Sequence, residues 1–246
     1  MNQYRADLHI HSVLSPCADL NMSPSKIIKE ALKKRIDILG ITDHNCTYHC
    51  RLMTELGANA GIMVLPGVEI STKEEIHCLA FFENNDITDE FQKFLDEKLP
   101  PVPNDKKLFG YQLVVDKDEN IVSEVETLLL SALNADIYEV SNEVHRLGGV
   151  FIPAHIDRPS NSILSQLGFL PQDLNIDALE VSILNPVADY LKKFPEYEKY
   201  TVISNSDAHR LENIGRTTSL FKIGEFAFPE IVMAFRRENH RKISVR

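Results

Sequence analysis

The chain has 246 residues, of which 43% are hydrophobic and 25% are charged, as is usual for a globular protein with a substantial core. It contains 26 lysine and arginine residues against 36 aspartate and glutamate residues, which gives a formal net charge of −10. We do not expect so acidic a chain to hold duplex nucleic acid through a broad surface of phosphate contacts. A nucleotide or a short single strand in a local pocket stays open as a partner.

No stretch of the sequence approaches the roughly 18 apolar residues of a membrane span. The first residues also lack the basic and then apolar pattern of a secretory signal. We therefore expect a cytoplasmic protein without membrane contact, whose cysteines are reduced thiols. The sequence indicates no obligate protein partner and does not determine the oligomeric state.

Residues 5–12, Arg-Ala-Asp-Leu-His-Ile-His-Ser, alternate between polar and apolar side chains with the period of a β-strand. Asp7, His9 and His11 therefore share one face of this strand, and the apolar residues between them point the opposite way. Ordinary polar residues on a half-exposed strand are the alternative. An acid and two imidazoles on one face favour a metal site over that alternative.

The next part of the chain alternates between helices and short strands. Ser23 followed by Pro24 predicts the start of a helix that ends near Arg35. Further elements are predicted as a helix over 47–60 and strands over 37–42, 62–70 and 75–82. These strands carry or deliver polar residues of metal-ligand type, namely Asp43, His44, Glu69 and His77.

Residues 83–136 differ in composition and hydrophobic pattern from the rest of the chain. They are highly charged, contain the proline-rich stretch 100–103, and show no clear strand–helix unit. We interpret them as an insertion over one end of the fold and a candidate lid. Residues 100–112 in particular are predicted to line or cover the mouth of the site.

The regular pattern resumes after the insertion. We predict helices over 137–147, 187–193 and 229–238 and strands over 150–154, 178–182, 201–204 and 219–223. His155 directly follows one of these strands, and Asp207 and His209 follow another. Repeated strand–helix units favour either a parallel barrel or a doubly wound sheet. Polar groups at the ends of several strands favour the barrel, because its C-terminal face lets them converge, and we expect one domain over 1–246.

Imidazoles and carboxylates dominate the set of candidate ligands: His9, His11, His44, Glu69, His77, His155, Asp207 and His209. This mixture suits two or three divalent ions of zinc, manganese or iron rather than a thiolate-rich structural zinc. A glutamate among several histidines commonly bridges two metals. Paired metals polarise a phosphoryl oxygen, activate water and stabilise both the entering and the leaving oxygen, which phosphate-ester hydrolysis requires.

The motifs of this chain resemble those of the PHP family, named for polymerase and histidinol phosphatase. They are Asp-Leu-His-Ile-His-Ser at 7–12, Ile-Thr-Asp-His at 41–44, Gly-Val-Glu-Ile-Ser at 67–71, His77, His155 and Ser-Asp-Ala-His at 206–209. The resemblance implies an α/β fold, a distorted TIM-like (β/α)7 barrel with a trinuclear metal site that hydrolyses phosphate esters. It leaves the segment 83–136 unexplained.

Ligand sets for three metals follow from this resemblance. One metal would take His9, His11, Glu69 and Asp207, a second Glu69, His77 and His155, and a third His44 and His209. Two imidazoles are too few for a tight third site, so the family pattern implies a further ligand from the loop after the first strand. This chain offers Cys17 and Asp19 there. We favour Asp19 slightly, because a thiolate beside a redox-capable metal is exposed to oxidation, although Asp19 could instead cap a turn.

Other polar residues near the motifs receive supporting roles. We expect Asp7 and Asp43 to orient imidazoles, and Arg158 and Arg216 to bind a substrate phosphate, with pairing to a structural carboxylate as the alternative for one arginine. The remaining histidines are predicted to be surface residues rather than ligands: His49, His145 and His240.

The sequence therefore indicates a metal-dependent phosphoesterase that acts on a phosphomonoester, a nucleotide or a short oligonucleotide. A metal-dependent amidohydrolase is the first alternative, since metal-activated water can also attack a carbonyl. A regulatory module that keeps metals without turnover is the second. Intact ligand motifs argue against this second alternative.

Overall fold

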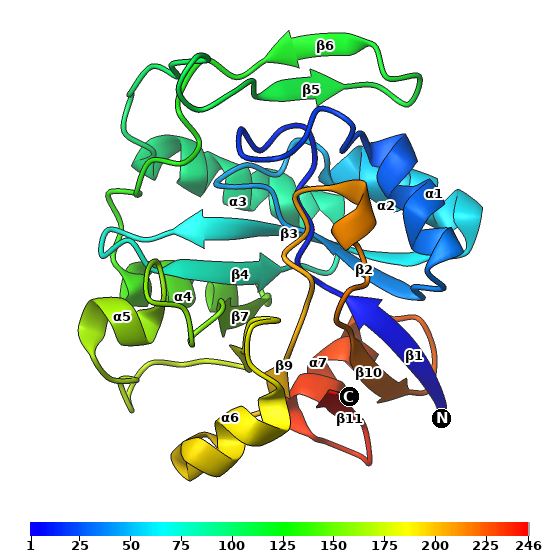
Figure 1. The fold of residues 1–246 in the computed structure, drawn as a ribbon, viewed down its shortest axis with the longest axis vertical. Coiled ribbons are helices and arrows are strands. Elements are labelled where there is room, and N and C mark those ends of the chain that lie inside the picture. Colours follow the sequence, from blue (N-terminus) through cyan, green and yellow to red (C-terminus); the bar gives the residue numbers. More distant parts are fainter. Residues whose placement is uncertain (246) are drawn as a thin grey trace.

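A computed structural model describes residues 1–245 as a mixed α/β fold around a curled sheet (Figure 1). The strands of this sheet follow one another in the order β11-β10-β1-β2-β3-β4-β7. Their bounds are β1 Asn2–Asp7, β2 Ile38–Ile41, β3 Met63–Ser71, β4 His77–Phe81, β7 Val150–Pro153, β10 Ser219–Ile223 and β11 Lys242–Val245. A separate parallel pair consists of β8 (Leu179–Glu180) and β9 (Val202–Ile203).

Backbone hydrogen bonds outside the strands join this pair to the main sheet. On one side, Ile156 N donates to Glu180 O at 2.8 Å, which links the end of β7 to β8. On the other side, Ala208 N donates to His9 O at 3.1 Å, and His11 N donates to Ala208 O at 3.0 Å. The ring β1-β2-β3-β4-β7-β8-β9 therefore closes through the extension of β1, and the predicted distorted TIM-like barrel is confirmed.

The strand directions depart from a simple series of parallel units. β1, β2 and β3 are parallel, but β4 is antiparallel to both β3 and β7, and β10 is antiparallel to β1. The connection between β3 and β4 is a tight turn in which Thr72 N donates to Ile76 O at 2.9 Å. Such a turn is too short for a crossover helix, so the strand predicted over 75–82 is present but runs antiparallel, unlike the parallel units expected of the barrel.

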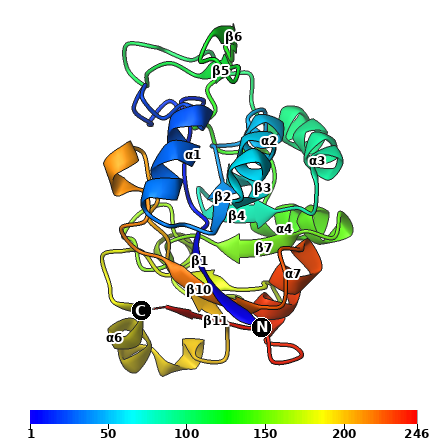
Figure 2. The same ribbon diagram turned by 90° about the vertical axis from the view of Figure 1, so that its right-hand side faces the viewer.

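Helices cover the outside of the barrel (Figures 1 and 2). Their bounds are α1 Pro24–Lys33, α2 Cys50–Ala60, α3 Asn85–Lys98, α4 Ile137–Arg146, α5 Ile163–Leu167, α6 Val187–Lys193 and α7 Phe228–Arg236, with short 3-10 helices η1 Pro195–Tyr197 and η2 Leu211–Asn213. Local sequence signals determine where several of these helices begin. Ser23 accepts a hydrogen bond from Lys26 N before Pro24, and Asp136 forms a capping box with Glu139. Within residues 1–245, no helix combines the length and apolar character needed to cross a membrane.

The segment 83–136 contains more regular structure than its sequence suggested. The prediction that this segment lacks a regular strand–helix unit is wrong at its start, where α3 is found. This helix begins after the N-cap Asn84 and buries Phe91 and Leu95 in the core. Thus α3 directly follows β4, and α4 directly precedes β7. The remainder carries the hairpin of β5 (Leu113–Val115) and β6 (Ile121–Glu124), which lies at the top of Figure 1.

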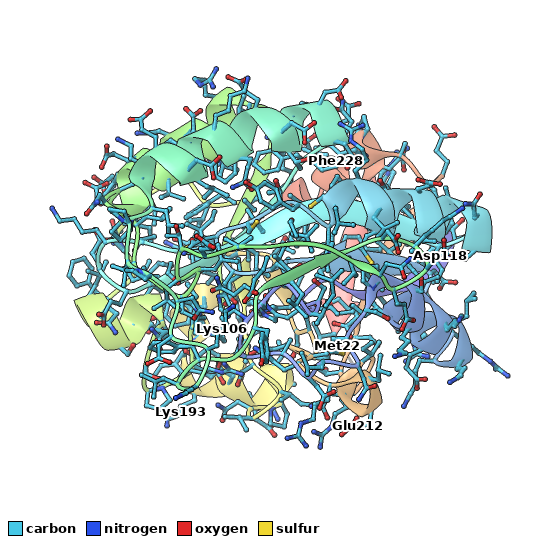
Figure 3. The ribbon with its side chains drawn as sticks, turned by 90° about the horizontal axis from the view of Figure 1, so that it is seen from above. Met22, Lys106, Asp118, Lys193, Glu212 and Phe228 are labelled. Atoms are coloured by element: carbon cyan, nitrogen blue, oxygen red, sulfur yellow. The ribbon has the colours of Figure 1, made fainter. Side chains whose placement is uncertain are left out.

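The hairpin lies against the loop 13–22 that follows the first strand. Leu113 N donates to Val13 O at 3.3 Å, and the backbone at Gly110 approaches Pro16 so closely that a Cβ there would lie 2.6 Å from Pro16 O. Seen from above, the green hairpin segment crosses the middle of the molecule, with Lys106 near the centre (Figure 3). The insertion is therefore packed on a loop that leads directly from the histidines of the first strand.

Candidate metal centre

A buried glutamate lies at the centre of a cluster of histidines. Glu69, on β3, is 1% exposed, and its Oε2 atom is 3.2 Å from His11 Nε2, 3.2 Å from His44 Nδ1 and 3.4 Å from His9 Nε2. Its Oε1 atom faces the opposite group, at 2.9 Å from His77 Nδ1 and 3.2 Å from His155 Nε2. The two carboxylate oxygens thus serve separate sets of imidazoles.

Asp207 and His209 enter this cluster from the segment that closes the barrel. Asp207 Oδ1 lies 3.5 Å from the Nε2 atoms of His9 and His11 and 3.5 Å from His209 Nδ1. Asp207 has φ +48° and His155 has φ +30°, values that are unfavourable for residues other than glycine. Each such conformation costs on the order of 1–3 kcal/mol and persists only where the surroundings enforce it.

Ligand atoms come within 4.8 Å of one another in three overlapping groups. The groups are His9, His11 and Glu69; His44, Glu69 and His77; and His11, His44 and His209. Every member was a candidate ligand in the sequence. The structure also brings His155 and Asp207 against the same carboxylate and imidazoles.

The outer hydrogen bonds of two histidines fix their orientation. His9 Nδ1 donates to Glu180 Oε2 at 3.0 Å, and His11 Nδ1 donates to Ser15 Oγ at 3.1 Å. Ser15 Oγ in turn donates to Asp43 Oδ1 at 2.6 Å. The Nε2 atom of each imidazole is therefore directed into the cluster, as metal-binding histidines require.

Four buried nitrogen atoms of the cluster have no hydrogen-bond partner, which shows whether its residues suit a metal ion. They are His9 Nε2, His11 Nε2, His44 Nδ1 and His155 Nδ1, all of which belong to the cluster. A buried polar atom without a partner is costly, and several in one place indicate that a bound group supplies the missing contacts. Imidazole nitrogens and carboxylate oxygens are suitable ligands for zinc, manganese or iron, so the residues fit divalent metal.

The charge balance of the cluster supports the same conclusion. Burial by itself lowers the pKa of His11, but the nearby carboxylates of Asp207 and Glu69 raise the pKa to about 9. Burial raises the pKa of Glu69, but the positive charge of His77 and His9 holds it well below the usual value. Burial also lowers the pKa of His209 to about 4. The buried carboxylates thus depend on nearby positive charge, which divalent cations would also supply.

Glu180 is a site residue that the sequence analysis missed. This β8 side chain is 1% exposed and accepts hydrogen bonds from His9 Nδ1, from Asn205 Nδ2 at 2.8 Å and from His155 N at 3.0 Å. It therefore links three strands at the centre. A glutamate within the otherwise apolar stretch 178–181 was the available signal, because buried glutamates are rare unless they are paired.

The two aspartates expected to orient imidazoles behave differently. Asp43 acts on His11 through Ser15, as described above. Asp7 contacts no imidazole and instead accepts hydrogen bonds from Ser206 N at 3.0 Å, Ser206 Oγ at 2.6 Å and Gly215 N at 2.7 Å. The expected role of Asp7 is therefore wrong in detail, because its carboxylate fastens the loop that carries Asp207.

Only one of the two arginines reaches the cluster. Arg158 Nη2 lies 2.5 Å from Asp207 Oδ2, and 33% of the Arg158 side chain is exposed. Arg216 is exposed and donates to Asn213 Oδ1 at 3.1 Å within its own turn. The placement of Arg216 in the phosphate site is not supported, because its charge is held by a local contact.

The loop 13–22 does not bring either proposed ligand into the three groups. Asp19 is exposed, and its Oδ1 atom accepts hydrogen bonds from Asn21 N at 2.8 Å and Asn21 Nδ2 at 2.9 Å. This geometry favours the turn-capping alternative for Asp19. Cys17 is exposed, and its thiol belongs to none of the three groups.

The histidines predicted to lie on the surface divide into three cases. His240 is exposed, as predicted, and His145 is half-buried, with Nε2 3.0 Å from Asp177 Oδ2. For His49 the prediction is wrong, because it is 1% exposed. His49 Nδ1 donates to Ser12 Oγ at 2.6 Å, and its Nε2 accepts from Val115 N at 3.0 Å.

Comparison with known proteins places this arrangement among related chains. The chain is 26% identical to the uncharacterised protein YqxK of Bacillus subtilis over 99% of its own length and 64% of YqxK. It is similar to the lesion-specific endonuclease PfuEndoQ of Pyrococcus furiosus, with a TM-score of 0.75 and 21% identity over 98% of this chain and 58% of that one. A complex of Endonuclease Q with a 27-mer duplex substrate that has an abasic lesion at the active site gives a TM-score of 0.70, with 20% identity and the same coverage.

The chain thus spans about three fifths of the length of these proteins. At such identities the structural likeness concerns the fold. The sequence pattern of the PHP domain, however, matches residues 7–170, which is more than half of the chain and includes most of the histidine cluster. The chain therefore belongs to the PHP domain family.

Proposed function

We propose that this chain is a metal-dependent phosphoesterase. The observation that carries the proposal is Glu69, whose two oxygens face separate sets of imidazoles in the manner of a bridging ligand. Membership of the PHP family and the likeness to an endonuclease support the same chemistry.

Two or three divalent ions of zinc, manganese or iron fit the cluster. The residues that would hold them are His9, His11, His44, Glu69, His77, His155, Asp207 and His209. When bound, such ions polarise a phosphoryl oxygen and activate water for attack. The third ligand group, His11, His44 and His209, shares His11 with the first group, so a third ion would need a further ligand besides His44 and His209.

The protein's own side chains would position the ester. Arg158 is held at one end by Asp207 and is partly exposed, so its remaining N–H groups are available to a phosphate oxygen. Glu180 and the Asp43–Ser15 pair keep His9 and His11 in fixed orientations. The substrate is a small phosphorylated compound or a short nucleic acid, and the duplex bound by Endonuclease Q supports the second choice.

Hydrolysis by metal-loaded protein tests this proposal against both alternatives. The metal-free chain is loaded separately with zinc, manganese and iron(II) and offered p-nitrophenyl phosphate, bis(p-nitrophenyl) phosphate, short oligonucleotides and amide substrates. We expect release of alcohol from a phosphate ester and none from amides. Hydrolysis of amides alone would establish an amidohydrolase, and tight metal binding without any turnover would establish a regulatory module.

Alanine at Arg158 separates phosphate binding from metal binding. We expect Arg158→Ala to raise KM about tenfold with unchanged metal content, because it removes charge-assisted hydrogen bonds to the ester. Arg216→Ala is the matched control and should behave like the unmodified chain, since Arg216 contacts Asn213. Loss of thermal stability in Arg158→Ala with unaltered kinetics would assign Arg158 to the support of Asp207.

A further inference from the structure

A groove of about 620 Å³ opens beside the candidate metal centre. It runs between the loop after β7, α5 and α6, and its lining includes Arg158, Leu164, Asn185, Tyr190, Lys193 and Phe194. Arg158 belongs both to this groove and to the centre, because its guanidinium contacts Asp207. A molecule in the groove therefore has one end at the cluster of candidate ligands.

Aromatic side chains form one wall of the groove. The ring centres of Tyr190 and Phe194 are 4.9 Å apart, and Tyr190 is 7% exposed, so its position is fixed by packing. Burial raises the pKa of Tyr190, which keeps the phenol neutral. Tyr190 thus supports the half-buried Phe194, whose ring can stack on a nucleic-acid base, a contact that contributes about 1–3 kcal/mol.

A free cation lies at the end of α6. The Lys193 ammonium is 5.2 Å from the centre of the Phe194 ring and has no ion-pair partner among residues 1–245. Lys192 beside it differs, because its ammonium lies 3.0 Å from Asp189 Oδ1. Figure 3 shows Lys193 at the edge of the face whose middle the hairpin crosses. The lining of the groove thus offers two cations, Arg158 and Lys193.

The acidic residues of the groove are occupied by neighbours. Asp157 accepts hydrogen bonds from Ser182 N at 2.7 Å, Ser182 Oγ at 2.7 Å and Asn185 Nδ2 at 2.6 Å. Asp189 is paired with Lys192. Their negative charge is therefore partly compensated, and an anionic ligand in the groove meets less repulsion than the residue types alone suggest.

We infer that this groove binds a short single strand of nucleic acid beside the scissile phosphate, an inference that rests on the proposed function. The scissile phosphate lies at the metal cluster beside Arg158, one base stacks against Phe194, and a further phosphate lies at Lys193. The second cation distinguishes a strand from a mononucleotide, which has no further phosphate to place there. A net charge of −10 also favours a local strand over a broad duplex surface.

Fluorescence anisotropy with a labelled tetrathymidylate, on the full chain loaded with a metal, tests the groove directly. We expect Lys193→Glu to weaken binding about tenfold and to reduce the slope of log affinity against log salt by about one, because one phosphate contact is lost. Lys192→Glu, on the same helix, is the control and should bind like the unmodified chain. Phe194→Leu keeps an apolar side chain and should also weaken binding, through lost stacking.

The outcomes separate the groove from the proposed function. Equal weakening by Lys193→Glu and Lys192→Glu, or none by either, overturns the groove even if the unmodified chain hydrolyses p-nitrophenyl phosphate. Selective weakening by Lys193→Glu with no hydrolysis of any ester by metal-loaded protein supports the groove as a strand-binding site and refutes the phosphoesterase. Binding of thymidine monophosphate as tight as that of the strand refutes the second phosphate position.

Discussion

Glu69 is the residue with the largest number of partners in the candidate centre. Its carboxylate is fully surrounded by imidazoles, so its negative charge is the common counter-charge for both sets of candidate ligands. A neutral amide of the same shape would leave two cations without this shared ligand. The single carboxylate therefore determines whether paired metals can be held at all.

The first prediction concerns this carboxylate. Glu69→Gln should lose at least one metal equivalent, measured by elemental analysis, and should abolish phosphate-ester hydrolysis. Glu55→Gln, on the exposed face of α2, is the control and should keep both properties. Activity of Glu69→Gln within about tenfold of the unmodified chain at full metal loading would exclude the bridging role.

The second prediction concerns Glu180, which orients His9 from behind. Glu180→Gln should weaken metal binding by roughly 10- to 100-fold, because an amide can present its N–H to His9 Nδ1 and disturb the tautomer that directs Nε2 to the metal. Metal titration with a competing chelator measures the loss. Retained affinity in Glu180→Gln would show that packing alone fixes His9.

Among the elements, the β5–β6 hairpin has a direct connection to the metal shell. Val115 N donates to His49 Nε2, His49 Nδ1 donates to Ser12 Oγ, and Ser12 Oγ donates to Asp43 Oδ2 at 2.6 Å. Asp43 also holds the Ser15 hydroxyl that supports His11. Burial lowers the pKa of His49, so the neutral imidazole can accept at one nitrogen and donate at the other.

The third prediction is that His49→Leu loosens the hairpin and the metal site together. The substitution leaves Val115 N and the Ser12 hydroxyl without their partner, at a cost of about 1–3 kcal/mol. Limited proteolysis should cut the hairpin sooner, and the affinity for metal should fall. His49→Gln, which retains an acceptor for Val115 N, should restore much of the protection, and the exposed His240→Leu should change neither property. Faster cutting with unchanged metal affinity would confine His49 to the hairpin.

The sequence predicted those elements whose signals are local. Alternation placed His9 and His11 on one face, and Ser23-Pro24 marked the start of α1. The helix α3 was missed because its polar face dominates the composition, although Phe91 and Leu95 are spaced as a helix requires. The strand β4 was predicted, but its antiparallel direction was not. Strand direction depends on the length of the preceding turn, which apolar periodicity does not indicate.

The candidate site shows the same division between local motifs and tertiary contacts. Residues in short motifs, such as His44 and Asp207, could be identified from the order of strand and ligand. The roles of Glu180, Asn205 and His49 could not, because each acts on a partner that only the closed barrel brings near. The roles of Asp7 and Arg216 were misassigned for the same reason, since proximity in sequence to a ligand does not determine the direction of a side chain.

At the scale of the whole molecule, the four cysteines are distributed unevenly between core and surface. Cys46, Cys50 and Cys78 are buried, and Cys17 is exposed. Burial raises the pKa of the three buried thiols, so none of these is primed for rapid oxidation.

The fourth prediction therefore concerns thiol labelling of the native chain. One equivalent of iodoacetamide should react slowly with the folded protein and four should react in denaturant, with Cys17→Ser reducing the native value to zero. Protection of Cys17 by added zinc would give the third metal group a thiolate ligand, contrary to the arrangement of His11, His44 and His209. Rapid labelling of more than one native thiol would show that the core around Cys78 opens readily.

The closure of the barrel by the extension of β1 and residue 208 has a consequence for biosynthesis. Pairs such as Asp7 with Ser206 are 199 positions apart in the chain, so a ribosome must finish most of the polypeptide before they can meet. A nascent chain that has emerged only as far as β7 presents four of the candidate ligand histidines around an open strand edge, with His155, Asp207 and His209 still to be made. Such late, long-range contacts are slow to form, and open edges invite aggregation. Complete metal loading must therefore wait until residues 207–209 have been made, and the open strand edge stays exposed until then.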